Sequence, residues 1–204
     1  MAKIKTRART LDMLGRQQIA GIPTALSELF KNAHDAYADN VEVDYIRKRN
    51  LLILRDNGLG MTREEFEDRW LTIGTDSKFD DEDAIEKPAI DMDKDKRPVM
   101  GEKGIGRLAI AAIGPQVLVM TRSKRENELG ELVVSFINWS LFSLAGLDLS
   151  DIDIPLLTKK NGENATFEDV ESLKYQAIEN VKNLSNKISL SKIEQICNEI
   201  KIFN

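Results

Sequence analysis

The sequence predicts an α+β fold, and three observations lead to this class. Residues 22–39 repeat their apolar side chains at helical spacing. Two pairs of short apolar runs, within 41–54 and 115–137, are each separated by a polar turn, as neighbouring strands are. Beyond residue 165 helical spacing returns in two further segments. Strands and helices therefore occupy separate stretches of one chain.

The first helix is predicted over residues 22–39, IPTALSELFKNAHDAYAD, with Pro23 at a position where its missing N–H costs nothing. At about 100° per residue, one face collects the apolar side chains Leu26, Leu29, Phe30, Ala33 and Tyr37. The opposite face carries a narrow row of oxygen-bearing side chains, namely Glu28, Asn32, Asp35 and Asp39. Taken alone, this row is typical of a solvated acidic face.

Two strands and a glycine loop follow the helix. Residues 41–46, VEVDYI, alternate as a half-buried strand does, and residues 51–54, LLIL, read as a more buried strand after a polar turn. That strand runs into DNGLGM, residues 56–61, where two closely spaced glycines let the backbone approach a ligand. Thr62 and Glu65 form a capping box, so a second helix begins here and carries Phe66, Trp70 and Ile73 on its apolar face.

A long charged loop separates this helix from a second glycine cluster. Residues 76–100 are dense in Asp, Glu and Lys and contain two prolines, which predicts a functional or disordered loop. GEKGIGRLAIAAIG, residues 101–114, then places three glycines before an apolar helix. We expect strands over 115–121 and 131–137, with a turn at 127–130.

The last part of the chain predicts a packed connection and two helices. Residues 139–144 are the connection, and residues 152–155 resemble a short edge strand. After a polar break, Thr166 is the expected cap of one amphipathic helix, and a second begins between Ser189 and Ser191.

Composition excludes several classes of protein. The 204 residues are 42% apolar and 31% charged, which fits a soluble globular protein with one good core. The single cysteine, Cys197, forms no intrachain disulfide and fits a reducing, cytoplasmic compartment. With His34 as the one histidine, a histidine-based metal site or catalytic triad is disfavoured. No stretch approaches the roughly 18 apolar residues of a membrane span.

Charge leaves the N-terminal segment open to two interpretations. The net charge of −5 argues against a domain that binds polyanions over its whole surface. Residues 1–20 form a basic arm with no apolar run behind it, so they are not a secretory signal. This arm is either a solvated tail or a contact for a phosphate backbone or a partner.

The second glycine loop and the acidic run before it do not match three known motifs: a P-loop, a dinucleotide-binding loop and a calcium-binding loop. The spacing of a P-loop is absent, and residues 104–109 match G-x-G-x-x-A without the strand that a dinucleotide site requires. The acidic run 91–95 imitates a calcium loop, but Lys96 stands where that turn needs glycine. What remains is a helix N-terminus with free N–H groups and Lys103, which predicts either a phosphate-binding loop or a flexible hinge.

Together, the separate features are consistent with a nucleotide site. An aspartate at the first glycine loop can accept a hydrogen bond from the exocyclic amine of adenine. Asn32 can offer a neutral oxygen to Mg²⁺, whose other ligands are water and phosphate oxygens. Glu28, one turn earlier, can orient or deprotonate a water aimed at a terminal phosphate.

The segments ELFKNAHDAYAD, DNGLGM and GEKGIGRLA resemble the three signature boxes of the GHKL superfamily. That superfamily includes DNA gyrase B, the ninety-kilodalton heat-shock chaperones, sensor histidine kinases and the MutL proteins. The resemblance covers roughly residues 20–137 and implies a Bergerat fold, a two-layer sandwich in which helices cover one face of a mixed, mostly antiparallel sheet. It implies an ATP-binding domain over 21–160 with a lid at 76–100, and a C-terminal helical extension, 161–204, that begins a further region.

The resemblance also implies a role for each matching residue. Glu28 would be the general base, and Asn32 the magnesium ligand, with Asp35 in support. Asp56 would hold the adenine amine, helped by Thr121 through a water. Two further sets are implied: the base pocket would be shaped by Gly58, Gly60 and Met61, and the phosphates would be cradled by Gly101, Lys103, Gly104, Ile105 and Gly106.

The function implied is Mg²⁺-dependent ATP binding and hydrolysis that drives closure of a homodimer. Glu28 favours the ATPase branches, because sensor kinases need no base for water and use a phosphoacceptor histidine, a role that does not suit His34 inside the helix. Residues 73–78, IGTDSK, resemble the microrchidia-type and prokaryotic branch. A nucleotide sensor with little hydrolysis and a histidine-kinase-like phosphotransferase remain as alternatives, and a DNA or protein client would act through regions outside this chain.

Overall fold

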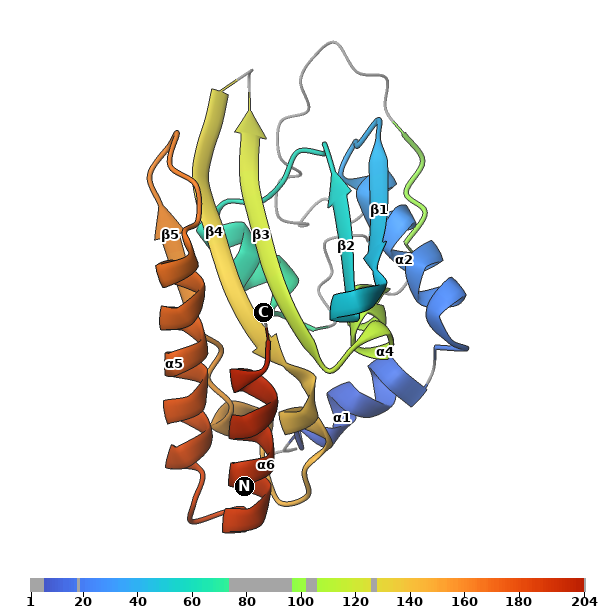
Figure 1. The fold of residues 1–204 in the computed structure, drawn as a ribbon. Helices are drawn as coiled ribbons and strands as arrows, with labels where there is room; N and C mark the ends of the chain where they lie inside the picture. The colour runs from blue at the N-terminus through green and yellow to red at the C-terminus, as the bar shows by residue number, and fades with distance from the viewer. Residues whose placement is uncertain (1–5, 18, 74–96, 102–105, 126–127, 204) are drawn as a thin grey trace, which may run out of the picture.

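The computed structural model describes residues 6–17, 19–73, 97–101, 106–125 and 128–203. Its strands are β1 (Val41–Ile46), β2 (Leu51–Asp56), β3 (Gln116–Arg125), β4 (Glu128–Asn138) and β5 (Leu156–Lys159). Its α-helices are α1 (Arg9–Asp12), α2 (Ile22–Asp35), α3 (Arg63–Glu65), α4 (Ile110–Ile113), α5 (Phe167–Asn183) and α6 (Leu190–Lys201). Figure 1 shows the helices packed around a strand layer, which confirms the predicted α+β class.

Shorter turns complete the described part of the chain. Two π-helical turns extend α1 and α3, at Met13–Gln17 and Phe66–Trp70. The 3₁₀ turns are Arg47–Arg49, Gly106–Ala109, Trp139–Ser143 and Leu149–Asp151. No helix in the described ranges has the length and apolar character needed to span a bilayer.

The strands form two antiparallel ladders. β1 pairs with β2 from Val41 opposite Asp56 to Ile46 opposite Leu51. β4 lies between β3 and β5 in the second ladder. β2 and β3 lie side by side and point the same way (Figure 1), and the loop after β2 bonds to β3 through Leu59 O and Lys124 N, 2.8 Å apart. The mostly antiparallel character that was expected is confirmed, whereas the described strands form two separate antiparallel sheets instead of one mixed sheet.

Three local predictions differ from the structure. β3 and β4 continue through much of the expected 127–130 turn, because their long pairing is kept through an irregularity between Arg122 and Lys124. The short strand follows Pro155 instead of preceding it, and Pro155 O accepts a hydrogen bond from Ser135 Oγ at 2.9 Å. On α2, Ala25 and Ala33 are buried while Phe30 is 44% exposed, so the apolar face is narrower than the periodicity indicated.

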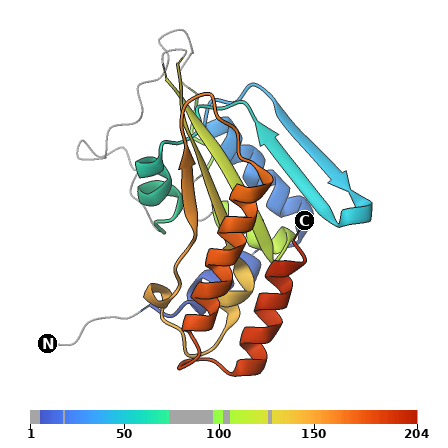
Figure 2. The ribbon, with the colours of Figure 1, turned by 60° about the vertical axis from the view of Figure 1, so that its left-hand side comes forward.

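Both faces of β4 are covered. Every residue from 132 to 138 is buried, and successive strand residues point to opposite faces. Phe136 meets Phe203 edge to face at 5.2 Å and belongs to the same core cluster as Leu173 and Ile200 of the C-terminal helices. The buried Lys174 of α5 donates to Phe203 O at 2.8 Å and thus holds the end of α6. Figure 2 shows these helices against the strands.

The described part of the N-terminal segment is docked on the core. Ala8 is fully buried and donates its N–H to Leu147 O at 3.0 Å. Arg7 pairs with Asp148 at 3.0 Å, and Leu11 joins the core cluster. The alternative of a solvated tail is therefore wrong for residues 6–12.

Candidate functional site

Helix α2 directs Glu28 and Asn32 at the start of the helix that follows the second glycine loop. A Cβ placed on Gly106 would lie 3.0 Å from Glu28 Oε2 and 3.7 Å from Asn32 Oδ1. The spacing of four residues puts both side chains on one face of α2, as predicted. Lys31 Nζ binds the other oxygen of Glu28 at 2.7 Å, so Oε2 is the oxygen that faces Gly106. A larger residue at 106 would press on the end of the Glu28 side chain.

Asp35 holds the backbone that leads into the second glycine loop. Its two carboxylate oxygens accept hydrogen bonds from the N–H groups of Met100, at 2.8 Å, and Gly101, at 3.0 Å. The buried Nδ1 of His34 lies 3.5 Å from Asp35 Oδ1. Asp35 thus supports the site by positioning main chain, and the partly buried His34 ring sits beside it.

The chain turns sharply after Asp35, four residues before the predicted end of the helix. Tyr37 adopts a left-handed conformation, with φ of 61°. Arg97 fastens this turn: its guanidinium donates to Ala38 O at 2.6 Å, pairs with Asp39 at 2.5 Å and lies 5.6 Å from the centre of the Tyr37 ring. Sequence reasoning missed Arg97, because an arginine at the edge of a charged loop gives no local signal.

The first glycine loop lies between the end of α2 and strand β3. Asp56 Oδ1 accepts the N–H of Gly58 at 2.9 Å, which closes the turn after β2. A Cβ on Gly58 would lie 2.7 Å from Ala36 O. Gly60 has φ of 58°, and its Cβ would lie 2.0 Å from Arg122 O. Both glycines are therefore required by close backbone contacts.

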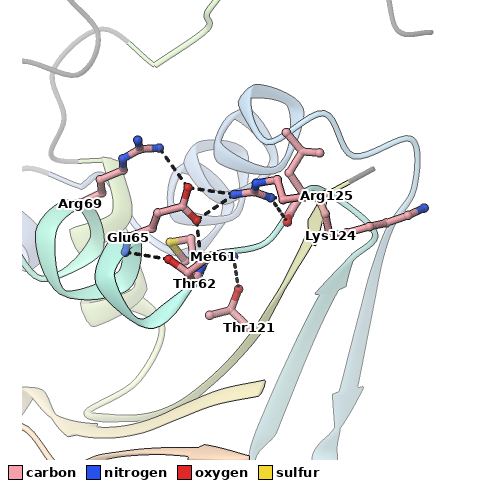
Figure 3. Close-up of polar contacts among 8 residues, drawn as sticks. Met61, Thr62, Glu65, Arg69, Thr121, Lys124 and Arg125 are labelled. Atoms are coloured by element: carbon pink, nitrogen blue, oxygen red, sulfur yellow. Dashed lines mark hydrogen bonds and ion pairs between the residues drawn. The ribbon is translucent and has the colours of Figure 1, made fainter. Parts of the chain in front are cut away.

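Thr121 reaches this loop directly. Its Oγ1 accepts the N–H of Met61 at 3.0 Å (Figure 3). Thr121 therefore contacts the loop at Met61, and its support of Asp56 through a water stays a prediction. The capping box predicted at the next helix is confirmed, since Thr62 and Glu65 bond to each other's main chain.

Glu65 and Arg125 complete the contacts between the loop, α3 and β3, and the sequence analysis assigned neither residue to the site. Arg125 Nη2 lies 2.9 and 2.8 Å from the two oxygens of Glu65, and its Nη1 donates to Leu59 O at 2.7 Å. Figure 3 shows the guanidinium between the loop and α3. The capping-box glutamate was the one available signal, although its arginine partner is distant in sequence.

The second glycine loop is anchored to α2 on both sides. Gly101 bonds to Asp35 near the end of α2, and Gly106 faces Glu28 and Asn32 nearer its start. Lys103, Gly104 and Ile105, together with residues 76–96 of the expected lid, lie outside the described residues. Next to Gly106, burial lowers the pKa of the Arg107 guanidinium from its ordinary value.

The oxygen donors near Gly106 fit a metal ion whose other ligands are water and phosphate oxygens. In the parts of the chain that the structure describes, no three His, Cys, Asp or Glu side chains gather as a metal cluster. An amide oxygen from Asn32 suits Mg²⁺, which keeps water and phosphate oxygens in its coordination shell. Asn32 Oδ1 and Glu28 Oε2 both lie beside Gly106, so an ion held here would have the Asn32 amide oxygen as a ligand and the Glu28 carboxylate next to it.

Comparisons with known proteins match this region. The family model described as histidine kinase-, DNA gyrase B- and HSP90-like ATPase matches residues 21–150. A protein of Herpetosiphon aurantiacus, provisionally named the type II restriction enzyme HgiDII, is 33% identical over 104 residues, 51% of this chain and 15% of that protein. The chaperone protein HtpG of Wigglesworthia glossinidia brevipalpis is 28% identical over 86 residues, 42% of this chain and 13% of its own length. The matches therefore span a small fraction of both relatives.

Proposed function

Because this chain belongs to the family of histidine kinase-, DNA gyrase B- and HSP90-like ATPases, we propose that it binds ATP with Mg²⁺ and hydrolyses it. The observation that carries the proposal is the approach of Glu28 and Asn32 to Gly106, which joins the polar row of α2 to the glycine loop. A helix face with a base and a metal ligand, set against a phosphate loop, is what hydrolysis of a terminal phosphate requires.

In this proposal Asp56 accepts the hydrogen bond of the adenine amine, and Gly58, Gly60 and Met61 line the base. The phosphates lie along residues 101–106, and Asn32 gives its amide oxygen to Mg²⁺. The bound ion would neutralise charge on the phosphate oxygens. Glu28 Oε2 orients a water and takes its proton, while Lys31 holds the other carboxylate oxygen in place.

The proposal extends to an assembly cycle. ATP would favour a closed homodimer over an open state, in a cytoplasmic protein, because a nucleotide shifts a conformational equilibrium by binding one state more tightly. The domain would span 21–160, with residues 161–204 continuing towards a further region. A DNA substrate or a protein client would act on parts of the protein beyond this chain, in line with the names of its two relatives.

Two substitutions test the assigned roles. Glu28→Ala should retain ATP affinity and lose hydrolysis by about 100-fold or more, the usual contribution of a general base. Asp56→Asn should lose ATP binding. Affinity is measured by calorimetry and hydrolysis by single-turnover phosphate release, with and without Mg²⁺. Glu194→Ala, an exposed glutamate on α6, is the control for a lost carboxylate.

Other outcomes distinguish the alternatives. Hydrolysis by Glu28→Ala at the parental rate would remove Glu28 from the role of base. ATP binding by the parent protein with no turnover would support a nucleotide sensor. Transfer of the terminal phosphate to protein, stable to a chase, would support a kinase-type reaction.

A further inference from the structure

The first glycine loop lies on β3 through main-chain contacts at closely spaced positions. Leu59 O accepts the N–H of Lys124 at 2.8 Å, and Met61 N–H donates to Thr121 Oγ1 at 3.0 Å. Between them Gly60 packs so closely on Arg122 O that no side chain fits. The loop position therefore depends directly on β3.

Arg125 is the side chain that locks this position to a second element. Its Nη1 donates to Leu59 O at 2.7 Å and to Lys124 O at 2.9 Å, so it joins loop and strand. Its Nη2 contacts both oxygens of Glu65, at 2.9 and 2.8 Å, and so reaches α3. A planar guanidinium can hold these directions at once because its donors are fixed in a fork.

The Glu65 carboxylate contacts three residues, Arg125, Thr62 and Arg69, and is mostly shielded from water. One oxygen accepts the N–H of Thr62 at 2.9 Å, which completes the helix cap, and Arg69 approaches the carboxylate at 3.7 Å. The side chains of Glu65 and Arg125 are 18% and 27% exposed. Pairs shielded in this way are screened less by salt than surface pairs and hold a more defined geometry.

We propose that Arg125 and Glu65 are positioning residues that hold the loop 56–61 in register with β3 and thereby set the preference of the site for adenine. They touch no nucleotide; they act through Leu59 and Met61. The proposal rests on the function proposed above, in which Asp56 reads the exocyclic amine. Without the guanidinium, the loop can shift relative to β3, and the carboxylate of Asp56 moves with it.

The test compares dissociation constants for ATP and ITP, which differ at the exocyclic group, in the full chain. Arg125→Lys keeps the charge but loses the fork, and Glu65→Gln keeps the helix cap while removing the ion pair. Each should reduce the preference for ATP over ITP by about tenfold or more, since misplacement by about 1 Å can cost about 100-fold. Lys124→Gln is the control: its exposed side chain points away from the cluster (Figure 3), so the preference should not change.

A merely structural role gives a different result. If the pair only stabilised the fold, the variants would melt at lower temperature and bind both nucleotides with an unchanged ratio, which would overturn the inference. Should Arg125→Lys fail to fold, Glu65→Gln decides by the same ratio. A parent protein that binds ITP as tightly as ATP would overturn the role of Asp56 itself, and this inference with it.

Discussion

Gly60 is the residue at which conformation and contact together allow only one amino acid. Its φ of 58° is rarely adopted by side chains with a Cβ, and a Cβ would lie 2.0 Å from Arg122 O. Gly162 shares a positive φ, 85°, but has no atom within 4 Å of the corresponding position. Comparing Gly60 with Gly162 therefore distinguishes the cost of a left-handed backbone, which both share, from the cost of a steric clash, which only Gly60 would incur.

Gly60→Ala should lose ATP binding and several kcal/mol of folding free energy, because the loop must leave β3. Gly162→Ala should cost only about 1–2 kcal/mol, the penalty of a left-handed alanine, and leave ATP binding intact. Chemical denaturation and calorimetric titration measure both quantities. Equal losses in the two variants would show that the contact with Arg122 is unimportant.

At the scale of elements, α5 begins at a capping box formed by two residues close in the sequence, Thr166 and Asp169. Thr166 accepts the N–H of Asp169 at 3.2 Å, and Asp169 accepts the N–H of Thr166 at 2.8 Å. Lys159 at the end of β5 also binds Asp169, at 3.1 Å. The bond from the Thr166 main chain and the contact with Lys159 hold the pKa of Asp169 below its usual value. One carboxylate thus joins α5 to β5.

This pKa shift predicts a pH dependence of stability. Because the pKa of Asp169 is lower in the folded state, its stabilising effect is present above the unfolded pKa of about 3.9 and is lost as pH falls through the folded value. Asp169→Asn should therefore melt below the parent at pH 7, and the gap should close in strong acid. Glu168→Gln, in the same helical turn, is the control. A gap that persists when the parent carboxylate is protonated would contradict the charge-based explanation.

At the scale of the whole molecule, large buried side chains gather around β4, whereas α2 buries only Ala25 and Ala33 and no residue of β1 or β2 is buried. The fully buried residues Val134, Leu173 and Val181 share one cluster. Segments from both ends of the chain, including Leu11 and Ile200, join it. The C-terminal helices are thus part of the core that supports the site.

Leu173→Ala should lower the free energy of unfolding by about 2–5 kcal/mol, the range for buried leucines. Leu190→Ala, at a position 71% exposed, should change it by less than about 0.5 kcal/mol. The signal is the fluorescence of Trp70 and Trp139, which lie outside α5 and α6. If Leu173→Ala left this transition unchanged, residues 161–204 would fold separately from the rest of the core.

Local chemistry was predictable from sequence, and tertiary contacts were not. The caps at Thr62 and Thr166 were predicted because donor and acceptor lie three residues apart. The approach of Glu28 and Asn32 to Gly106 agrees with the resemblance between the three motifs and a known superfamily. The early end of α2 was not predicted, and the contacts around it, such as those of Asp35 with the N–H groups of Met100 and Gly101, join residues far apart in the sequence.

The arginines that organise the site were missed for the same physical reason. Arg97 and Arg125 act through partners roughly sixty residues away, and no helical or strand periodicity links them. Helical spacing alone placed Phe30 on the apolar face, yet its side chain is 44% exposed. Helix periodicity shows which side chains share a face but not how much of that face other elements cover. Sequence patterns thus indicated the candidate ligand-binding groups of the three motifs but not the side chains that hold the loops.

The double cover of β4 has a consequence for how the protein is made. Synthesis runs from the N-terminus, so β4, which ends at Asn138, is complete before α6 begins at Leu190. Until α5 and α6 emerge from the ribosome, the face of β4 that carries Phe136 lacks the helices that pack on it. The motifs of the candidate site are thus translated before the helices that cover this strand.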